Sequence, residues 1–66
     1  MAAVYTIDVK CLCIEDSNYY NIRAGETFAG RVELGRTAAP LFIVKTKQGE
    51  QKFLHAQFTN YFVLIK

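Results

Sequence analysis

The apolar residues of this chain fall into short runs of strand length, and segments rich in polar residues and glycine separate these runs. The first run, residues 4–14, has the clearest pattern: its odd-numbered positions from Tyr5 to Cys13 are apolar, whereas positions 6, 8 and 10 are polar. Such alternation, in a segment dominated by β-branched and aromatic residues, is typical of a half-buried strand rather than a helix. We therefore expect the odd positions to face the core.

Four further strands are predicted, over residues 26–34, 41–47, 51–56 and 62–66. A single helical turn is expected within residues 57–62. Gly25 is predicted to lie in the turn before the second strand, and Gly49 in a tight hairpin between the third and fourth strands. Gly30 interrupts the second strand and predicts a bulge or a strong bend. The segment 35–40 is expected to be a connection.

The length of 66 residues allows one domain, covering residues 1–66. Because 52% of the residues are hydrophobic, intrinsic disorder is excluded. Five strands are too few for two stacked sheets, and an open sheet would leave an apolar face and two edges exposed. Closure into a barrel, with bends at glycines, removes both problems. The predicted fold is all-β: a small five-stranded barrel with one short helical turn before the last strand.

Four segments together resemble a group of small SH3-like barrel proteins of bacteria and their phages, most of which have no assigned function. These segments are V-K-C-L (9–12), Y-N-I-R-A-G-E-T-F (20–28), L-F-I-V-K-T-K-Q-G-E (41–50) and F-L-H-A-Q-F (53–58). The chain departs from the group at Glu26, where lysine is usual, and at His55, where proline is usual. Its connection at 35–40 is also longer. The resemblance implies an SH3-like barrel and a bacterial or phage origin, and it implies no reaction.

Cys11 and Cys13 are expected to fill the core as free thiols. On an extended chain they share one face, and their side chains are too far apart for an easy disulfide. Together with His55 they supply three soft ligands, one fewer than a structural zinc site needs. Free cysteine is among the most commonly buried residue types. We expect no metal, no cofactor and a reducing compartment.

No segment approaches the length of apolar sequence that a membrane-spanning helix requires. The first fourteen residues lack a basic n-region, and Asp8 and Lys10 interrupt any apolar stretch. These features predict a cytoplasmic protein, located in the host cytoplasm if a phage encodes it.

Catalysis is not expected. His55 is the only histidine, and the sequence contains no nucleophile elbow, phosphate-binding loop or zinc-protease motif. The carboxylates at Glu15, Asp16, Glu26 and Glu33 fall in polar segments, where burial would not tune their pKa.

Binding of a protein partner is the main functional prediction. Tyr19 and Tyr20 lie in a polar loop, and Tyr61 lies near the helical turn; such amphipathic rings suit contact surfaces. We expect one of Tyr19 and Tyr20 to be buried and the other exposed. With His55, these residues are the predicted partner contacts. The predicted function is a non-catalytic binding module, encoded by a phage, that modulates or inhibits a host bacterial protein.

Two alternatives remain open. A nucleic-acid-binding barrel would use the lysine hairpin of Lys45, Lys47 and Lys52, although a net charge of +2 provides little counterion release. A self-associating structural component would use the apolar segments 41–47 and 62–66. The expected oligomeric state is a monomer or a homodimer.

Overall fold

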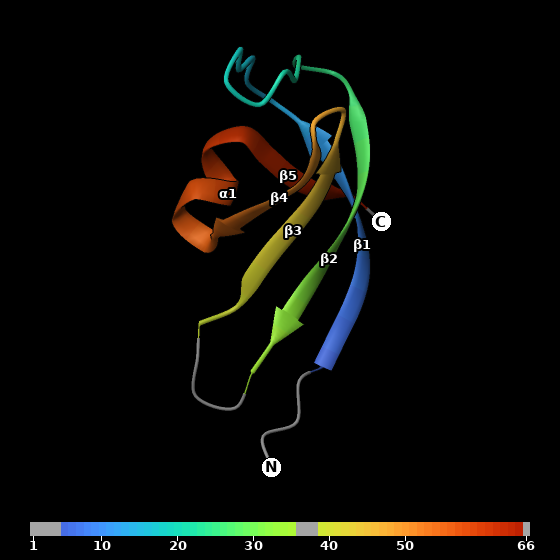
Figure 1. Ribbon diagram of the computed structural model, residues 1–66, viewed down its shortest axis with the longest axis vertical. Helices are drawn as coiled ribbons and strands as arrows, with labels where there is room; N and C mark the ends of the chain where they lie inside the picture. The colour runs from blue at the N-terminus through green and yellow to red at the C-terminus, as the bar shows by residue number, and fades with distance from the viewer. Residues whose placement is uncertain (1–4, 36–38, 66) are drawn as a thin grey trace.

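The computed structural model describes residues 5–35 and 39–65, which form five antiparallel strands in one sheet and a single short helix (Figure 1). The elements are β1 (Tyr5–Cys13), β2 (Thr27–Leu34), β3 (Leu41–Thr46), β4 (Gly49–Leu54), α1 (His55–Tyr61) and β5 (Phe62–Ile65). The prediction of a five-stranded all-β chain with a helical segment before the last strand is confirmed. Val4, Lys66 and part of the connection 35–40 lie outside the described residues.

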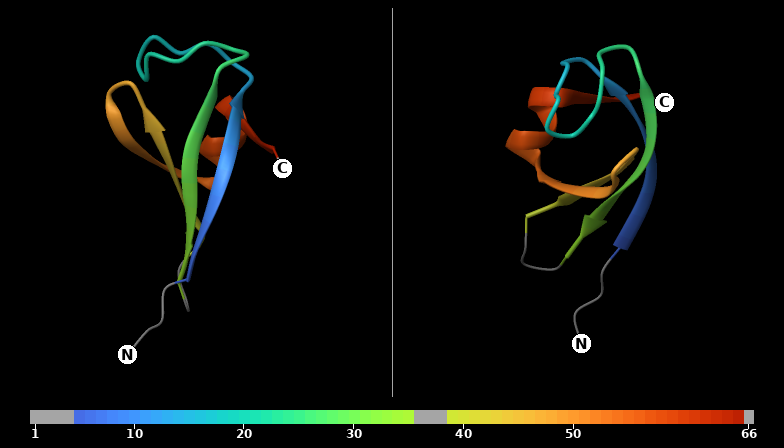
Figure 2. Two further views of the ribbon diagram at one scale, coloured as in Figure 1. Left: turned by 90° about the vertical axis from the view of Figure 1, so that its right-hand side faces the viewer. Right: turned by 45° about the horizontal axis from the view of Figure 1, so that its top comes forward.

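The sheet is open, so the prediction of a closed barrel is wrong. Its strand order is β4-β3-β2-β1-β5, and no ladder joins the described residues of β4 to those of β5. The helix α1 follows β4, precedes β5 and contacts both, as well as β3. It therefore covers the core where a closing ladder would have been needed. Figure 2 shows β3 and β4 diverging from the long β1–β2 pair toward the end that carries the loop 14–26.

The helix is longer than the predicted turn, and it begins inside the segment predicted as the fourth strand. The strand ends at Leu54, so residues 55 and 56 are helical. At the start of α1 the Gln57 side-chain oxygen accepts a hydrogen bond from the Leu54 N–H at 3.3 Å. At its end the Phe62 N–H donates to the Phe58 carbonyl. The glutamine is half of a capping box, which satisfies a backbone donor that the first turn cannot. α1 has seven residues, and no described helix is long and apolar enough to cross a bilayer.

The core lies on the inner face of the curved sheet, beneath α1. Phe58 of the helix stacks on Phe42 with ring centroids 4.5 Å apart and on Phe62 at 5.4 Å. Cys11 and Cys13 are fully buried beside these rings, which confirms their predicted place in the core. Burial of each phenylalanine contributes up to about 3 kcal/mol. An aromatic cluster of this kind gives a short chain a core in spite of its size.

Gly30 does not form the predicted bulge. Its register is unbroken, since it pairs with Val9 on one side and Val44 on the other. A Cβ atom at this position would lie 2.6 Å from the carbonyl oxygen of Ile43. Glycine is therefore needed because the backbone of β3 approaches β2 closely here. The turns predicted at Gly25 and Gly49 are confirmed, and both glycines have positive φ (94° and 101°).

The beginning of β1 is not half-buried as predicted. Tyr5 and Ile7 are 69% and 51% exposed, although they share a face with the buried Cys11. The described part of β5 ends opposite Lys10, and α1 covers the other end of the sheet. The odd-numbered face of β1 thus leaves the core about halfway along the strand.

Candidate protein-binding site

The loop 14–26 has a fixed shape because hydrogen bonds within it close a small hairpin. Ser17 and Ile22 each donate a backbone N–H to the carbonyl of the other, both at 3.0 Å. The Ile22 side chain is fully buried and anchors the loop to the core. Between them, the N–H of Asn21 (φ 57°) donates to the Asn18 carbonyl at 3.3 Å. Tyr19 and Tyr20 are the two central residues of the resulting tip.

Carboxylates fix the base of the same loop. Asp16 Oδ1 accepts a hydrogen bond from the Ala24 N–H at 2.7 Å, and Glu26 Oε1 accepts one from the Arg23 N–H at 2.8 Å. Glu26 Oε2 also pairs with Lys47 Nζ at 3.0 Å, which connects the loop to the tip of the β3–β4 hairpin. The hydrogen bond from Lys47 is the main reason that the pKa of Glu26 is lowered. The loop is thus attached at its base, at its buried isoleucine and at the hairpin.

Three tyrosines from distant parts of the sequence meet on this side of the molecule. Tyr20 contacts Tyr19 edge-to-face at 4.8 Å and Tyr61 of α1 edge-to-face at 5.5 Å. Tyr20 also packs at 4.9 Å on the buried Phe53. Tyr19 is 79% exposed, whereas Tyr20 is half-buried. We call Tyr19, Tyr20 and Tyr61 the tyrosine surface.

The expected contrast between the two loop tyrosines therefore holds in a weaker form, with Tyr20 half-buried rather than fully buried.

The packing of the two loop tyrosines has a consequence for mutagenesis. The sequence alone predicts that replacing Tyr19 and Tyr20 together leaves the fold intact. Because Tyr20 packs on the core, its removal would also cost stability. Tyr19 alone is the residue whose loss affects only the surface.

His55, the fourth predicted contact, lies apart from the tyrosine surface, at the start of α1. Its ring is 5.7 Å from that of Phe42. It borders an open apolar groove of about 300 Å³ between α1 and β5. The residues that line this apolar groove are Phe42, His55, Phe58, Thr59, Phe62, Val63 and Leu64. The sequence placed Val63 and Leu64, which are both exposed, in a short apolar final strand, but it could not show that α1 and this strand form a groove together.

The three lysines of the proposed nucleic-acid surface are exposed, and carboxylates lie among them. Glu50 is opposite Lys45 in the β3–β4 ladder and lies two residues before Lys52. The Arg31 guanidinium binds Glu50 at 2.7 Å and lowers the pKa of that carboxyl. Lys47 is paired with Glu26. This face of the sheet has mixed charge rather than a continuous basic stripe.

Desolvation raises the pKa of the thiols of Cys11 and Cys13, so that both are poor nucleophiles. Within residues 5–35 and 39–65, no group of three or more histidine, cysteine, aspartate or glutamate side chains is arranged to hold a metal ion.

Comparisons with protein-family models, with curated proteins and with solved structures find no match to this chain. The resemblance to small SH3-like proteins of bacteria and phages stays a prediction from the sequence motifs.

Proposed function

We propose that this chain is a non-catalytic protein-binding module with an SH3-like arrangement of strands, and that the tyrosine surface contacts the partner. The order of elements supports the first part. A long first strand, an excursion loop, three strands in a meander and a short helix precede a final strand that pairs with the first. In SH3-like barrels, peptides bind between the first long loop and the terminal helical turn. Here Tyr20 and Tyr61 meet at that place.

The observation that carries the proposal is the exposure of Tyr19 on a preformed support. A tyrosine that is 79% exposed presents a large apolar ring to solvent, yet its loop is held by internal hydrogen bonds and its ring packs edge-to-face on Tyr20. Ordering a flexible side chain on binding costs about 0.5–1.5 kcal/mol. A ring that is already positioned avoids much of that cost, and tyrosine is enriched among the residues that dominate binding energy.

We propose that a phage encodes this chain, that it acts in the host cytoplasm, and that its partner is a bacterial host protein. Such a module acts by occupancy: a rigid body covers a functional surface of its target. The apolar groove beside His55 is separate from the tyrosine surface, so His55 is the weaker of the proposed contacts.

Nucleic acid is the less favoured ligand. Binding to a phosphate backbone requires cations free to displace counterions. Lys47 already has a carboxylate partner, and Glu50 lies between Lys45 and Lys52. Salt-dependent binding through these lysines remains the alternative that the experiment must detect.

The experiment is a capture of partners from bacterial lysate with the tagged protein, with and without nuclease, followed by mass spectrometry. Three baits are compared: the wild type, Tyr19→Ala, and Tyr5→Ala as a matched control. Tyr5 is also a highly exposed tyrosine, but it begins β1, and the start of β1 lies at the end of the molecule opposite to the loop 14–26 (Figure 1). We expect one dominant protein that survives nuclease, is captured by Tyr5→Ala and is lost with Tyr19→Ala. Capture that disappears with nuclease would instead assign the function to the lysine hairpin.

A further inference from the structure

One side of β1 has no neighbouring strand along its first half, as far as the structure describes the chain. The ladder to β5 begins at Lys10, which pairs with Ile65, whereas β1 itself begins at Tyr5. Backbone groups alternate in direction along a strand. Cys13 directs its N–H and C=O toward the β2 side, where they bond to Glu26 and Gly25, each at 2.8 Å.

By this alternation the odd-numbered residues of β1 bond to β2, and the even-numbered residues face the other way. The Ile14 N–H, which donates to Tyr61 at the β5 side, agrees with this direction. Thr6 and Asp8 therefore present both of their backbone groups outward. We call residues Tyr5–Val9 the β1 edge.

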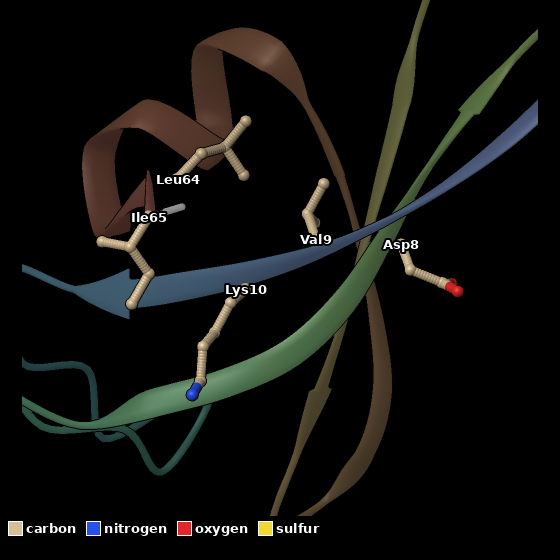
Figure 3. Close-up of a pocket in the computed structure, with 5 residues that line it drawn as sticks. All are labelled: Asp8, Val9, Lys10, Leu64 and Ile65. Carbon is tan, nitrogen blue, oxygen red and sulfur yellow. The ribbon is translucent and has the colours of Figure 1, made fainter.

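Apolar side chains lie directly beside this edge. Tyr5 and Ile7 are on the inner face of the sheet, and Leu64 of β5, which is 50% exposed, continues the same face past Val9. Figure 3 shows Val9 and Leu64 projecting to one side of β1 while Asp8 and Lys10 project to the other. These four residues and Ile65 line an open hollow of about 600 Å³.

The β1 edge has little of the usual protection against pairing. Natural edge strands carry lysine, proline, a bulge or an inward-facing charge. Residues 5–9 contain neither lysine nor proline, their register with β2 is continuous, and their inward-facing side chains are apolar. The β1 edge carries one charge, Asp8, whose side chain points away from Val9, whereas the edge strand at the other side of the sheet, β4, carries Glu50 and Lys52.

We propose that a second copy of this chain pairs with the β1 edge, antiparallel, with Ile7 on the two-fold axis. In this register Thr6 is opposite the partner's Asp8, and Asp8 is opposite the partner's Thr6. Both pairs are of the hydrogen-bonded kind and use all the outward backbone groups of the two residues. Ile7 faces the partner's Ile7 in a non-hydrogen-bonded pair, in which side chains come closest.

The edge is complementary to itself, and this favours a second copy over another occupant. Each Asp8 faces a threonine rather than another carboxylate, and Tyr5 faces the partner's Val9 on the apolar side. A slip of one residue would place apolar side chains opposite polar ones. The contact is small, below about 1,200 Å² in total, so the dimer is weak and depends on concentration. It leaves both tyrosine surfaces free, because the loop 14–26 lies at the end of the molecule opposite to the start of β1 (Figure 1).

Cysteine cross-linking tests this register. Ile7→Cys and Tyr5→Cys are compared at high protein concentration with a copper–phenanthroline oxidant, which accepts the two electrons as two thiols lose their protons and form a disulfide. The native cysteines are buried and do not interfere. On the two-fold axis the Cα atoms of the pair are about 4.5 Å apart, within disulfide range. The substituted Tyr5 positions are about 13 Å apart along the strands.

We expect a disulfide-linked dimer from Ile7→Cys and a monomer from Tyr5→Cys. No dimer from Ile7→Cys, or equal dimer from both variants, would overturn the proposed register.

Sedimentation equilibrium provides the second test. Asp8→Pro removes an outward N–H without removing a bond to β2, because proline is tolerated where a strand N–H faces solvent. Asp8→Ala changes the same side chain and keeps the N–H. At concentrations up to about 1 mM, we expect the wild type and Asp8→Ala to approach twice the 7.5 kDa monomer mass. We expect Asp8→Pro, shown to be folded by circular dichroism, to stay a monomer. A monomeric wild type, or a dimer that survives in folded Asp8→Pro, would overturn the proposal.

Discussion

Gly30→Ala is expected to destabilise the fold, although alanine is usually the better residue in a strand. The new Cβ would lie 2.6 Å from the Ile43 carbonyl oxygen, whereas ordinary contacts begin at 3.4 Å. The backbone of β3 must therefore move away from β2 by several tenths of an ångström. Cys11 Sγ at 3.4 Å and the Val44 Cα at 3.5 Å limit the room on the other sides.

The size of the effect follows from the ladder that this movement weakens. If two β2–β3 hydrogen bonds are stretched beyond useful length, the loss is about 1–3 kcal/mol. Alanine recovers about 0.4–1 kcal/mol by restricting the unfolded chain. With the mid-range values of about 2 and 0.7 kcal/mol, the net loss is about 1.3 kcal/mol, which corresponds to a fall in Tm of about 5–10 °C for a domain of this size.

Urea unfolding, followed by circular dichroism, measures this loss as a change in midpoint at constant m-value. The matched control is Ala29→Ser, which adds one atom at the adjacent, exposed position and should change stability by no more than about 0.5 kcal/mol. If Gly30→Ala is as stable as the wild type or more stable, the close approach of β3 to β2 is not the reason for glycine at this position.

Two further predictions concern the core and the loop. Phe58→Ala should lower the free energy of unfolding by about 3–5 kcal/mol, because it removes the ring that stacks on two others. A domain this small should then be largely unfolded when measured by circular dichroism. A cooperative melt near the wild-type Tm would contradict this prediction. The pKa of Glu26 is lowered in the folded state, so the unfolded chain binds more protons in acid. The stabilisation that this carboxylate provides is therefore present above pH 4.5, the usual pKa of the group, and is lost as the pH falls. Thermal melts from about pH 3 to 6 should therefore show a smaller change in Tm for Glu26→Gln than for the wild type, and identical profiles would exclude the pair with Lys47 as a source of stability.

Local signals in the sequence predicted the strands and turns well. The odd-position alternation located β1, and Gly25 and Gly49 marked turns that require positive φ. Cysteine spacing on one strand face correctly indicated burial of Cys11 and Cys13.

Features that depend on contacts between distant segments were not predictable. Whether the sheet closes depends on how α1 packs against β4 and β5. The first turn of α1 is capped by a hydrogen bond from the Leu54 N–H to the Gln57 side chain, and hydrophobic periodicity does not predict such a bond. Alternation placed Tyr5 and Ile7 on the inner face but could not show that β5 ends before reaching them. Likewise, residue type made both His55 and Tyr61 candidate partner contacts. Only the fold shows that Tyr61 belongs to the tyrosine surface, whereas His55 borders the separate apolar groove.

The most direct test of the proposed function is the affinity of the captured partner for the wild type, Tyr19→Ala and Tyr5→Ala, measured at two salt concentrations. A central aromatic contact is worth about 2 kcal/mol or more, so Tyr19→Ala should bind at least about tenfold more weakly. Tyr5→Ala should bind like the wild type, and salt should have little effect on any of the three. Equal affinity for the wild type and Tyr19→Ala would contradict the assignment of the tyrosine surface as the binding site.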